Sequence, residues 1–131
     1  MENKKVFLSI VMPAYNEEER IRESLRKIFD YLGKKEYLSE ILIVDDGSSD
    51  RTKEVPGNLA ISGNAFLRII SLGRNSGKGK AVRRGVSESR GEYILVVDAD
   101  LSTPIEEWDK FLIEHKNGFD IVIGSRGIDP T

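Results

Sequence analysis

One apolar run that ends in two carboxylates constrains the fold of this chain most strongly. Tyr93–Val97 is a continuous run of aromatic, aliphatic and β-branched residues, and Asp98 and Asp100 follow it at once. Such a run is typical of a strand that is covered on both faces in a parallel sheet. Because the two aspartates are two residues apart, in extended chain their side chains should leave on the same side. We therefore expect a buried strand whose carboxyl end carries two converging acids.

These two aspartates form a candidate metal site. They repel each other unless a cation binds, since no lysine or arginine lies between them. One alternative is that they are loop residues, one of which caps the following helix. Thr103–Glu106, however, resembles a capping box with Pro104 at the first helical position, which leaves the aspartates available. The chain has no cysteine and one histidine, so we expect Asp98 and Asp100 to bind a hard cation, Mg²⁺ or Mn²⁺.

Length and composition exclude several classes of protein. The chain has 131 residues, which predicts a single domain. Its 20 basic and 22 acidic residues give a formal net charge of −2, so we expect no nucleic-acid partner recruited by overall charge. The absence of cysteine excludes disulfides and thiol nucleophiles and fits a reducing compartment. The apolar runs have strand length, well short of the roughly 20 residues that span a bilayer.

Strand and helix patterns alternate along the chain. Short apolar runs predict strands at Val6–Met12, Ile41–Val44, Phe66–Leu72, Tyr93–Val97 and Phe119–Gly124. Helical patterns predict a helix between a cap at Asn16 and Gly33, a short one near Asp50 that Pro56 interrupts, one after Gly77, and one from Pro104 to Asn117 with His115 half-buried in its last turn. The alternation predicts an α/β fold, Rossmann-like, with a mostly parallel sheet and right-handed crossovers.

Acids also follow the other early strands. Asp45–Asp50 comes directly after the second predicted strand, and Glu17 lies close to the end of the first. Open α/β sheets bind ligands over the carboxyl ends of their strands, so these acids should gather on one rim with Asp98 and Asp100. A turn and a helix cap, supplied by Ser49 or Asp50, would account for part of the second cluster. Asp46 would then be left to accept hydrogen bonds from a base N–H or a ribose hydroxyl.

A glycine-rich segment, Gly73–Ala81, precedes the third long helical pattern. It is not a Walker loop, because no Ser or Thr follows its lysine. Basic residues crowd the positive end of the helix dipole there: Lys78, Lys80, Arg83 and Arg84. The residues leave two interpretations open, a solvated basic face or contact with a phosphate. Gly85, further along the same helix, indicates close packing against the sheet.

Four motifs occur in the order and at the spacing of a known family: Val11–Glu17, Ile43–Asp50, Asn75–Gly79 and Val97–Asp100. Together they resemble the family 2 glycosyltransferases over nearly the whole chain. The resemblance is strongest to the polyprenyl-phosphate (dolichyl-phosphate type) mannose and glucose synthases, which share the Gly-Lys-Gly helix start and the Asp-Ala-Asp-Leu run. It implies a three-layer GT-A fold, a UDP- or GDP-sugar donor, a divalent cation (Mg²⁺ or Mn²⁺) and inversion at the anomeric carbon.

The resemblance also implies a role for each matching position. Four residues would line the nucleoside pocket: Pro13, Ala14, Tyr15 and Glu17. Asp46 would contact the base, and Gly77 and Lys78 would flank the pocket. The family's DXD motif would be Asp98, Ala99 and Asp100, whose two carboxylates hold the metal and the diphosphate.

Family members continue past the last predicted strand into an acceptor-binding half. We therefore expect residues 1–131 to be the donor-binding part of a longer protein, inactive alone, with any catalytic base beyond Thr131. The implied acceptor is a polyprenyl phosphate or a glycan, and a polyprenyl phosphate is itself an anionic nucleophile. The implied location is cytoplasmic, at the cytoplasmic face of a membrane that only the missing parts contact. The face that the acceptor half would cover is expected to self-associate, which would give a homo-oligomer.

Two other classes fit less well. A receiver-like regulatory or non-catalytic nucleotide-binding domain also places acids at strand ends, but a receiver needs a lysine on a late strand, and none follows Lys116. A nucleotidyltransferase needs a glycine-rich, arginine-containing loop after the first strand, which Pro13–Asn16 is not. The identity of the base, the sugar and the acceptor stays open, as does the role of Pro56–Ala65.

Overall fold

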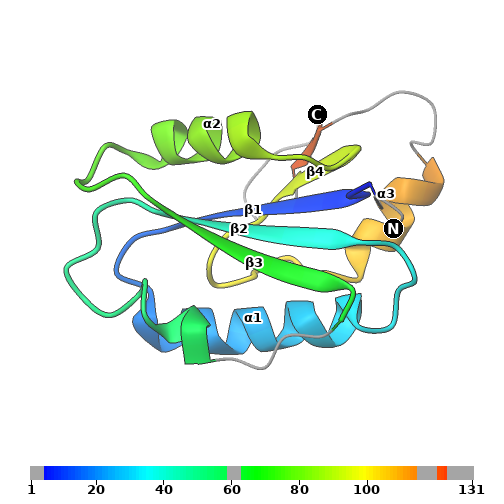
Figure 1. The fold of residues 1–131 in the computed structure, drawn as a ribbon, viewed down its shortest axis with the longest axis horizontal. Coiled ribbons are helices and arrows are strands. Elements are labelled where there is room, and N and C mark those ends of the chain that lie inside the picture. The colour runs from blue at the N-terminus through cyan, green and yellow to red at the C-terminus, as the bar shows by residue number, and fades with distance from the viewer. Residues whose placement is uncertain (1–4, 59–62, 115–120, 124–131) are drawn as a thin grey trace.

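A parallel five-stranded sheet between helices forms the fold (Figure 1). The computed structural model describes residues 5–58, 63–114 and 121–123. All strand pairs are parallel and the strand order is β3-β2-β1-β4-β5. Along the chain the elements are β1 (Leu8–Ala14), α1 (Glu18–Leu32), β2 (Ser39–Asp45), η1 (Val55–Asn58), β3 (Ala65–Ser71), α2 (Lys78–Glu88), β4 (Tyr93–Val96), α3 (Glu107–Glu114) and β5 (Ile121–Ile123). The predicted three-layer α/β fold is confirmed.

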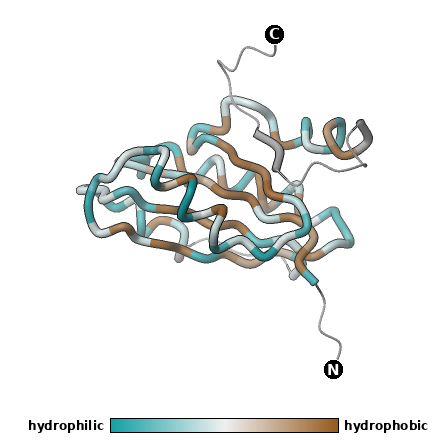
Figure 2. Tube along the Cα trace, turned by 90° about the horizontal axis from the view of Figure 1, so that it is seen from above, coloured by the Kyte–Doolittle hydropathy of each residue, from teal (hydrophilic) through white to brown (hydrophobic). Residues whose placement is uncertain are grey.

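Each face of the sheet has its own apolar core. On one face α1 contributes Ile21 and Leu25 to a core shared with β1 and β2, and Trp108 of α3 joins the same core beside Tyr93 of β4. On the other face α2 packs through Ala81 on alternate residues of the same strands, including Val11. Figure 2 shows the apolar residues concentrated along the central strands. Because β1 and β2 are buried on both faces, their sequences are nearly continuous apolar runs.

The close packing predicted at Gly85 is confirmed. A Cβ atom at this position of α2 would lie 2.4 Å from Val11 Cγ1 and 3.0 Å from Val44 Cγ2. Both atoms belong to the buried centre of the sheet, where side chains have little room to move. The missing side chain therefore sets how closely α2 approaches β1 and β2.

The order of the strands opens a crevice at the carboxyl ends of β1 and β4. The chain passes from β1 to β2 to β3 in one direction, then crosses back through α2 to place β4 on the other side of β1. The helices α1 and α2 consequently lie on opposite faces of the sheet (Figure 1). In open α/β sheets a reversal of this kind separates the loops on either side and leaves room for a ligand.

The first strand differs from its prediction. It begins and ends two residues later than the predicted Val6–Met12, and so includes Pro13. Val11 O accepts a hydrogen bond from Val97 N, directly after β4, and backbone groups two residues apart in a strand face the same neighbour. Pro13 nitrogen therefore faces past the end of β4, where no N–H is needed for the ladder.

Two predicted helix starts are wrong. Residues 51–58 form turns and then η1, in place of the short α-helix predicted near Asp50. The last helix begins at Glu107, not at Pro104, because the chain first makes a tighter turn in which Glu107 N and Trp108 N bond three residues back. His115 and the predicted helix end at Asn117 lie outside the described residues, as does all of the predicted strand Phe119–Gly124 except β5.

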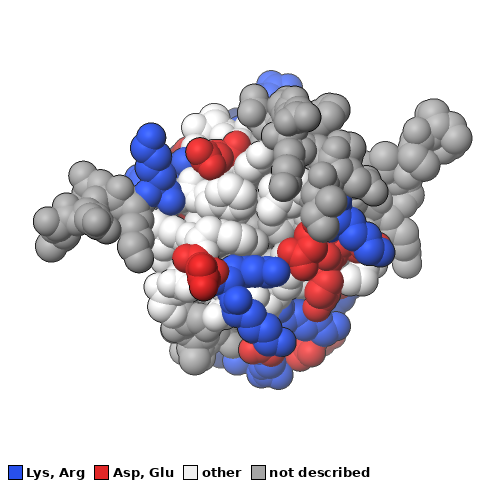
Figure 3. Space-filling view, turned by 90° about the vertical axis from the view of Figure 1, so that its right-hand side faces the viewer, with Lys and Arg blue, Asp and Glu red and all other residues white. Residues whose placement is uncertain are grey.

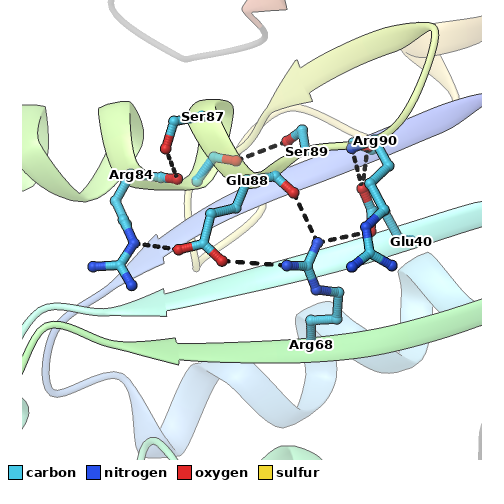
Figure 4. Close-up of polar contacts among 9 residues, drawn as sticks. Glu40, Arg68, Arg84, Ser87, Glu88, Ser89 and Arg90 are labelled. Carbon is cyan, nitrogen blue, oxygen red and sulfur yellow. Dashed lines mark hydrogen bonds and ion pairs between the residues drawn. The ribbon is translucent and has the colours of Figure 1, made fainter.

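A buried ion network joins the amino ends of the strands (Figure 4). Glu40, the second residue of β2, has no exposed surface. Its Oε2 accepts hydrogen bonds from Ser9 Oγ (2.6 Å) and Arg90 N (2.7 Å), and its Oε1 lies 3.1 Å from Arg68 Nη1. Arg68 also donates to the carbonyl and the carboxylate of Glu88. The network thus connects β1, β2, β3, the end of α2 and the start of β4.

The surface at this amino end carries both signs of charge. Figure 3 views it directly and shows basic and acidic side chains next to each other around an uncharged centre.

Through residues 5–58, 63–114 and 121–123, no helix is long and apolar enough to cross a membrane. The structure holds a single chain, so self-association stays a prediction.

Candidate functional site

A cavity of about 350 Å³ lies in the crevice at the carboxyl ends of β1 and β4. Its lining contains every site residue predicted from the sequence except Gly77, together with Ala81: Pro13, Ala14, Tyr15, Glu17, Asp46, Lys78, Ala81, Asp98, Ala99 and Asp100. These residues come from four separate segments, which the sheet topology brings together. The predicted gathering of acids on one rim is therefore observed, whereas the ligand of each residue stays a proposal.

The loops after β1 and β2 cap each other. Asn16 has a left-handed backbone (φ 52°) and its Oδ1 accepts hydrogen bonds from Ser49 N (2.9 Å) and Asp50 N (3.3 Å). In return Thr52 Oγ1 accepts from Glu17 N (2.8 Å), and Asp50 Oδ2 accepts from Glu18 N (3.3 Å). The predicted cap at Asn16 is wrong, because Glu17 occupies the cap position and residues of the other loop satisfy the first N–H groups of α1.

Asp50 is the central acceptor of this exchange. Burial by itself raises the pKa of its carboxyl, but hydrogen bonds from the Thr52 hydroxyl, Thr52 N and Glu18 N outweigh it, so the pKa is lowered overall. A carboxylate at the positive end of α1 is also favoured by the helix dipole. Asp50 is therefore a structural acid of the rim.

Asp46 is almost fully buried and holds the glycine-rich loop. Its Oδ1 accepts from Ser76 N (2.6 Å) and its Oδ2 from Gly77 N (3.0 Å). The expectation that Asp46 is left without a structural partner is thus wrong. Each carboxylate oxygen has a second lone pair, so Asp46 can position α2 and still accept a hydrogen bond from a ligand in the cavity. Gly77 does not line the cavity, but its N–H donates the hydrogen bond to Asp46 Oδ2.

Asp98 and Asp100 do not lie in extended chain. β4 ends at Val96, and a bond from Leu101 N to Asp98 O (2.9 Å) closes a turn in which Leu101 has φ 48°. Ser24 Oγ on α1 donates to Ala99 O (2.5 Å), which fixes the buried centre of the turn. The expected side-by-side departure from a strand is therefore wrong, although both carboxylates still line the cavity.

Cations from two helices reach these acids. Lys78 Nζ, at the start of α2, lies 2.6 Å from Asp98 Oδ1. Arg20 Nη1, on α1, lies 3.9 Å from Asp100 Oδ2, and Arg20 Nε lies 3.3 Å from Glu17 Oε2. That buried glutamate oxygen has no hydrogen-bond partner, so its contact with Arg20 is an ion pair only. No basic residue lies between the two aspartates in the sequence, but the fold brings Lys78 and Arg20 close to them.

The donor set fits a hard divalent cation that takes ligands from elsewhere. Asp98 and Asp100 offer carboxylate oxygens, the type that Mg²⁺ and Mn²⁺ prefer. In the part of the chain that the structure describes, no group of three or more His, Cys, Asp or Glu side chains is arranged so that it could hold a metal ion by itself. An ion here would therefore complete its coordination with water or with oxygens of a bound phosphate.

The sequence profile described as "Glycosyl transferase family 2" matches residues 9–130. The chain belongs to glycosyl transferase family 2. Among its relatives is a dolichyl-phosphate beta-glucosyltransferase of Dictyostelium discoideum, 39% identical over 140 residues that cover 96% of this chain and 43% of the relative. This family 2 chain spans less than half the length of these curated relatives.

Solved structures of similar fold contain nucleotides. The crystal structure of S. aureus TarS 1–349 in complex with UDP-GlcNAc has a TM-score of 0.66 and 28% identity, over 85% of this chain and 32% of that one. Glucosyl-3-phosphoglycerate synthase from Mycobacterium tuberculosis, in complex with Mn²⁺, UDP and glucosyl-3-phosphoglycerate, has a TM-score of 0.62 and 26% identity, over 83% and 39% of the chains. The GT-A fold of this family 2 chain is thereby confirmed.

Three residues at or next to the cavity were not predicted from the sequence. Ala81 lines the cavity from α2, Ser24 holds the Asp98–Leu101 turn, and Arg20 lies near Asp100. Arg20 follows Glu17 by one helical turn, so helix spacing alone could have paired them. Ala81 and Ser24 gave no such signal, since their partners are far away in sequence.

Gly47 offers a test of how the rim is assembled. A Cβ atom there would lie 2.3 Å from Arg74 C and 2.4 Å from Asn75 N, and the residue has φ +75°. We expect Gly47→Ala to displace this loop backbone and to lower the free energy of unfolding, measured by urea titration. Gly73→Ala is the matched control, because Gly73 also has φ +82° but no heavy atom within 4 Å of its Cβ.

The difference between these two variants isolates the clash from the backbone strain. Overpacking typically costs about 1–3 kcal/mol, so Gly47→Ala should lose that much more stability than Gly73→Ala. Equal losses would show that the loop yields freely and that Gly47 does not hold it in place.

Proposed function

We propose that the cavity binds the nucleoside diphosphate part of a UDP- or GDP-sugar. The observation that carries the proposal is the convergence of four acids and Lys78 on a single cavity at the switch point of the sheet. Membership of family 2 and the UDP complexes of similar structures support the same ligand class. The longer protein is proposed to transfer the hexose, with inversion, to a polyprenyl phosphate, the acceptor class in the name of the Dictyostelium relative.

Glu17 and Asp46 are proposed to recognise the nucleoside. Glu17 Oε2 is buried without a hydrogen bond, so a ribose hydroxyl or a base N–H would satisfy it. Asp46 keeps acceptor capacity beyond its two backbone bonds. Tyr15, which is 46% exposed, presents an aromatic ring beside them. Because Glu17 and Asp46 are both anions at neighbouring strand ends, contact with the uncharged nucleoside is favoured over contact with the negatively charged phosphates.

Asp98 and Asp100 are proposed to hold Mg²⁺ or Mn²⁺ together with the diphosphate. A bound divalent ion would neutralise the charge that develops on the departing nucleoside diphosphate. The protein's own part is to fix the two carboxylates in a turn that Ser24 ties to α1. Lys78 supplies a further positive charge on the side of α2.

The chain itself is proposed to be the donor-binding part of a longer transferase. Its share of the curated relatives, less than half, supports this view. A cytoplasmic location at the face of a membrane is proposed for the longer protein, consistent with a polyprenyl acceptor and with a chain that has no cysteine. A polyprenyl phosphate is already an anionic nucleophile and needs no general base.

Calorimetric titration of UDP, GDP and ADP into the chain, in MnCl₂ and in EDTA, tests the donor proposal. We expect UDP or GDP to bind with 1:1 stoichiometry, more tightly in Mn²⁺ than in EDTA, and ADP to bind more weakly. The metal dependence is expected because two carboxylates and a diphosphate repel one another. Equal affinity in Mn²⁺ and EDTA would contradict the metal role, and no binding of any nucleotide would contradict the donor site.

A further inference from the structure

Lys78 pairs with Asp98, one of the two carboxylates that would bind a metal ion. Its Nζ is 2.6 Å from Asp98 Oδ1, across the crevice between the start of α2 and the turn after β4. An ammonium ion at this distance donates to the same carboxylate that a divalent ion would bind, and two cations on one carboxylate repel each other. The contact therefore sets the lysine and the metal in competition.

A bound diphosphate would favour a different position of the Lys78 side chain. Lys78 is the first residue of α2, where the helix dipole disfavours a cation unless an anion is near. Its side chain is 63% exposed, so it can reorient within the cavity mouth, whereas that of Asp98 is 25% exposed. A diphosphate at the cavity would offer Lys78 a second anionic partner at the same helix end.

We propose that Lys78 guards the metal site: it pairs with Asp98 before the donor binds and moves to a diphosphate oxygen when the donor arrives, which releases Asp98 to the divalent ion. This inference rests on the proposed donor site. Its consequence is that nucleotide and metal bind with positive cooperativity. By thermodynamic linkage, each ligand must raise the affinity of the other by the same factor.

Replacing Lys78 with Met removes the charge and keeps most of the side-chain length. We expect Lys78→Met to bind MnCl₂ alone about twofold to fivefold more tightly than the wild type, the range for one exposed ion pair. The same variant should bind UDP in EDTA more weakly, and the factor by which UDP raises Mn²⁺ affinity should fall. Lys80→Met is the matched control, since it removes a lysine from the same helix turn but outside the cavity lining.

Titrations of Mn²⁺ alone, followed by electron paramagnetic resonance, and of UDP with and without Mn²⁺, followed by calorimetry, measure all of these quantities. Circular dichroism melts of both variants confirm that they fold. Tighter Mn²⁺ binding by Lys78→Met but not by Lys80→Met supports the guard. Unchanged or weaker Mn²⁺ binding by Lys78→Met overturns it, as does an unchanged coupling factor. Failure of every variant to bind UDP would instead count against the donor site, and the titration of Mn²⁺ alone would still decide between Lys78 and the metal.

Discussion

Asp100→Asn is expected to weaken UDP binding in Mn²⁺ by about tenfold to a hundredfold, the equivalent of one lost interaction with a charged group. Asp100 lines the cavity and has its nearest cation, Arg20, at 3.9 Å, so its carboxylate is little committed within the protein. The amide keeps the shape and the bond from Ser102 N but loses the charge that holds a divalent ion. Calorimetry in Mn²⁺ and in EDTA measures the effect.

Glu19→Gln provides the control for this experiment. It removes a negative charge from the first turn of α1, near the rim but outside the cavity lining. UDP should bind this variant as it binds the wild type, with the same loss in EDTA. If Asp100→Asn retained both the affinity and the metal dependence, Asp100 would not be a metal ligand.

Glu40→Ala should strongly lower the free energy of unfolding. Glu40 is fully buried and accepts hydrogen bonds from Ser9, Arg90 N and Arg68. Removing one member of a buried ion pair typically costs about 3–5 kcal/mol, because the other is left uncompensated. We expect a loss of that order in urea unfolding followed by circular dichroism. Glu40→Gln, which retains the size and one acceptor, should lose less.

Glu88→Ala separates the buried part of the network from its outer part. Glu88 pairs with Arg68 and with Arg84 near the surface, where water replaces a lost partner at little cost. Its effect should be much smaller than that of Glu40→Ala. Equal losses would mean that Arg68, and not the burial of Glu40, determines the stability of this end of the sheet.

Patterns that are local in sequence predicted the fold well. Continuous apolar runs identified the buried strands, and glycine at position 85 indicated the close approach of α2. The acids that follow β1, β2 and β4 predicted the shared rim, because parallel strands bring their carboxyl ends to one edge. In each case the signal and its structural consequence lie within a few residues, or follow from the parallel sheet itself.

Contacts between distant segments could not be predicted in this way. Asn16 bonds to residues 33 and 34 positions away, so its capping propensity serves a neighbouring loop and not its own helix. Glu40 directly precedes the predicted strand Ile41–Val44, and nothing near it in the sequence indicates that Ser9 and Arg68 enclose its carboxylate. The turn at Asp98 depends on a left-handed Leu101, for which the sequence carries no signal.

The position of the Glu40 network bears on how the protein can change. Its members lie at the amino ends of the strands, whereas the cavity lies at the carboxyl ends. Substitutions that share no contacts generally have additive effects. Variants of the cavity that alter nucleotide preference at the expense of stability could therefore be combined with stabilising changes near Glu40, each selected independently. A protein built in this way can change its ligand preference while the contacts at the amino ends of its strands stay the same.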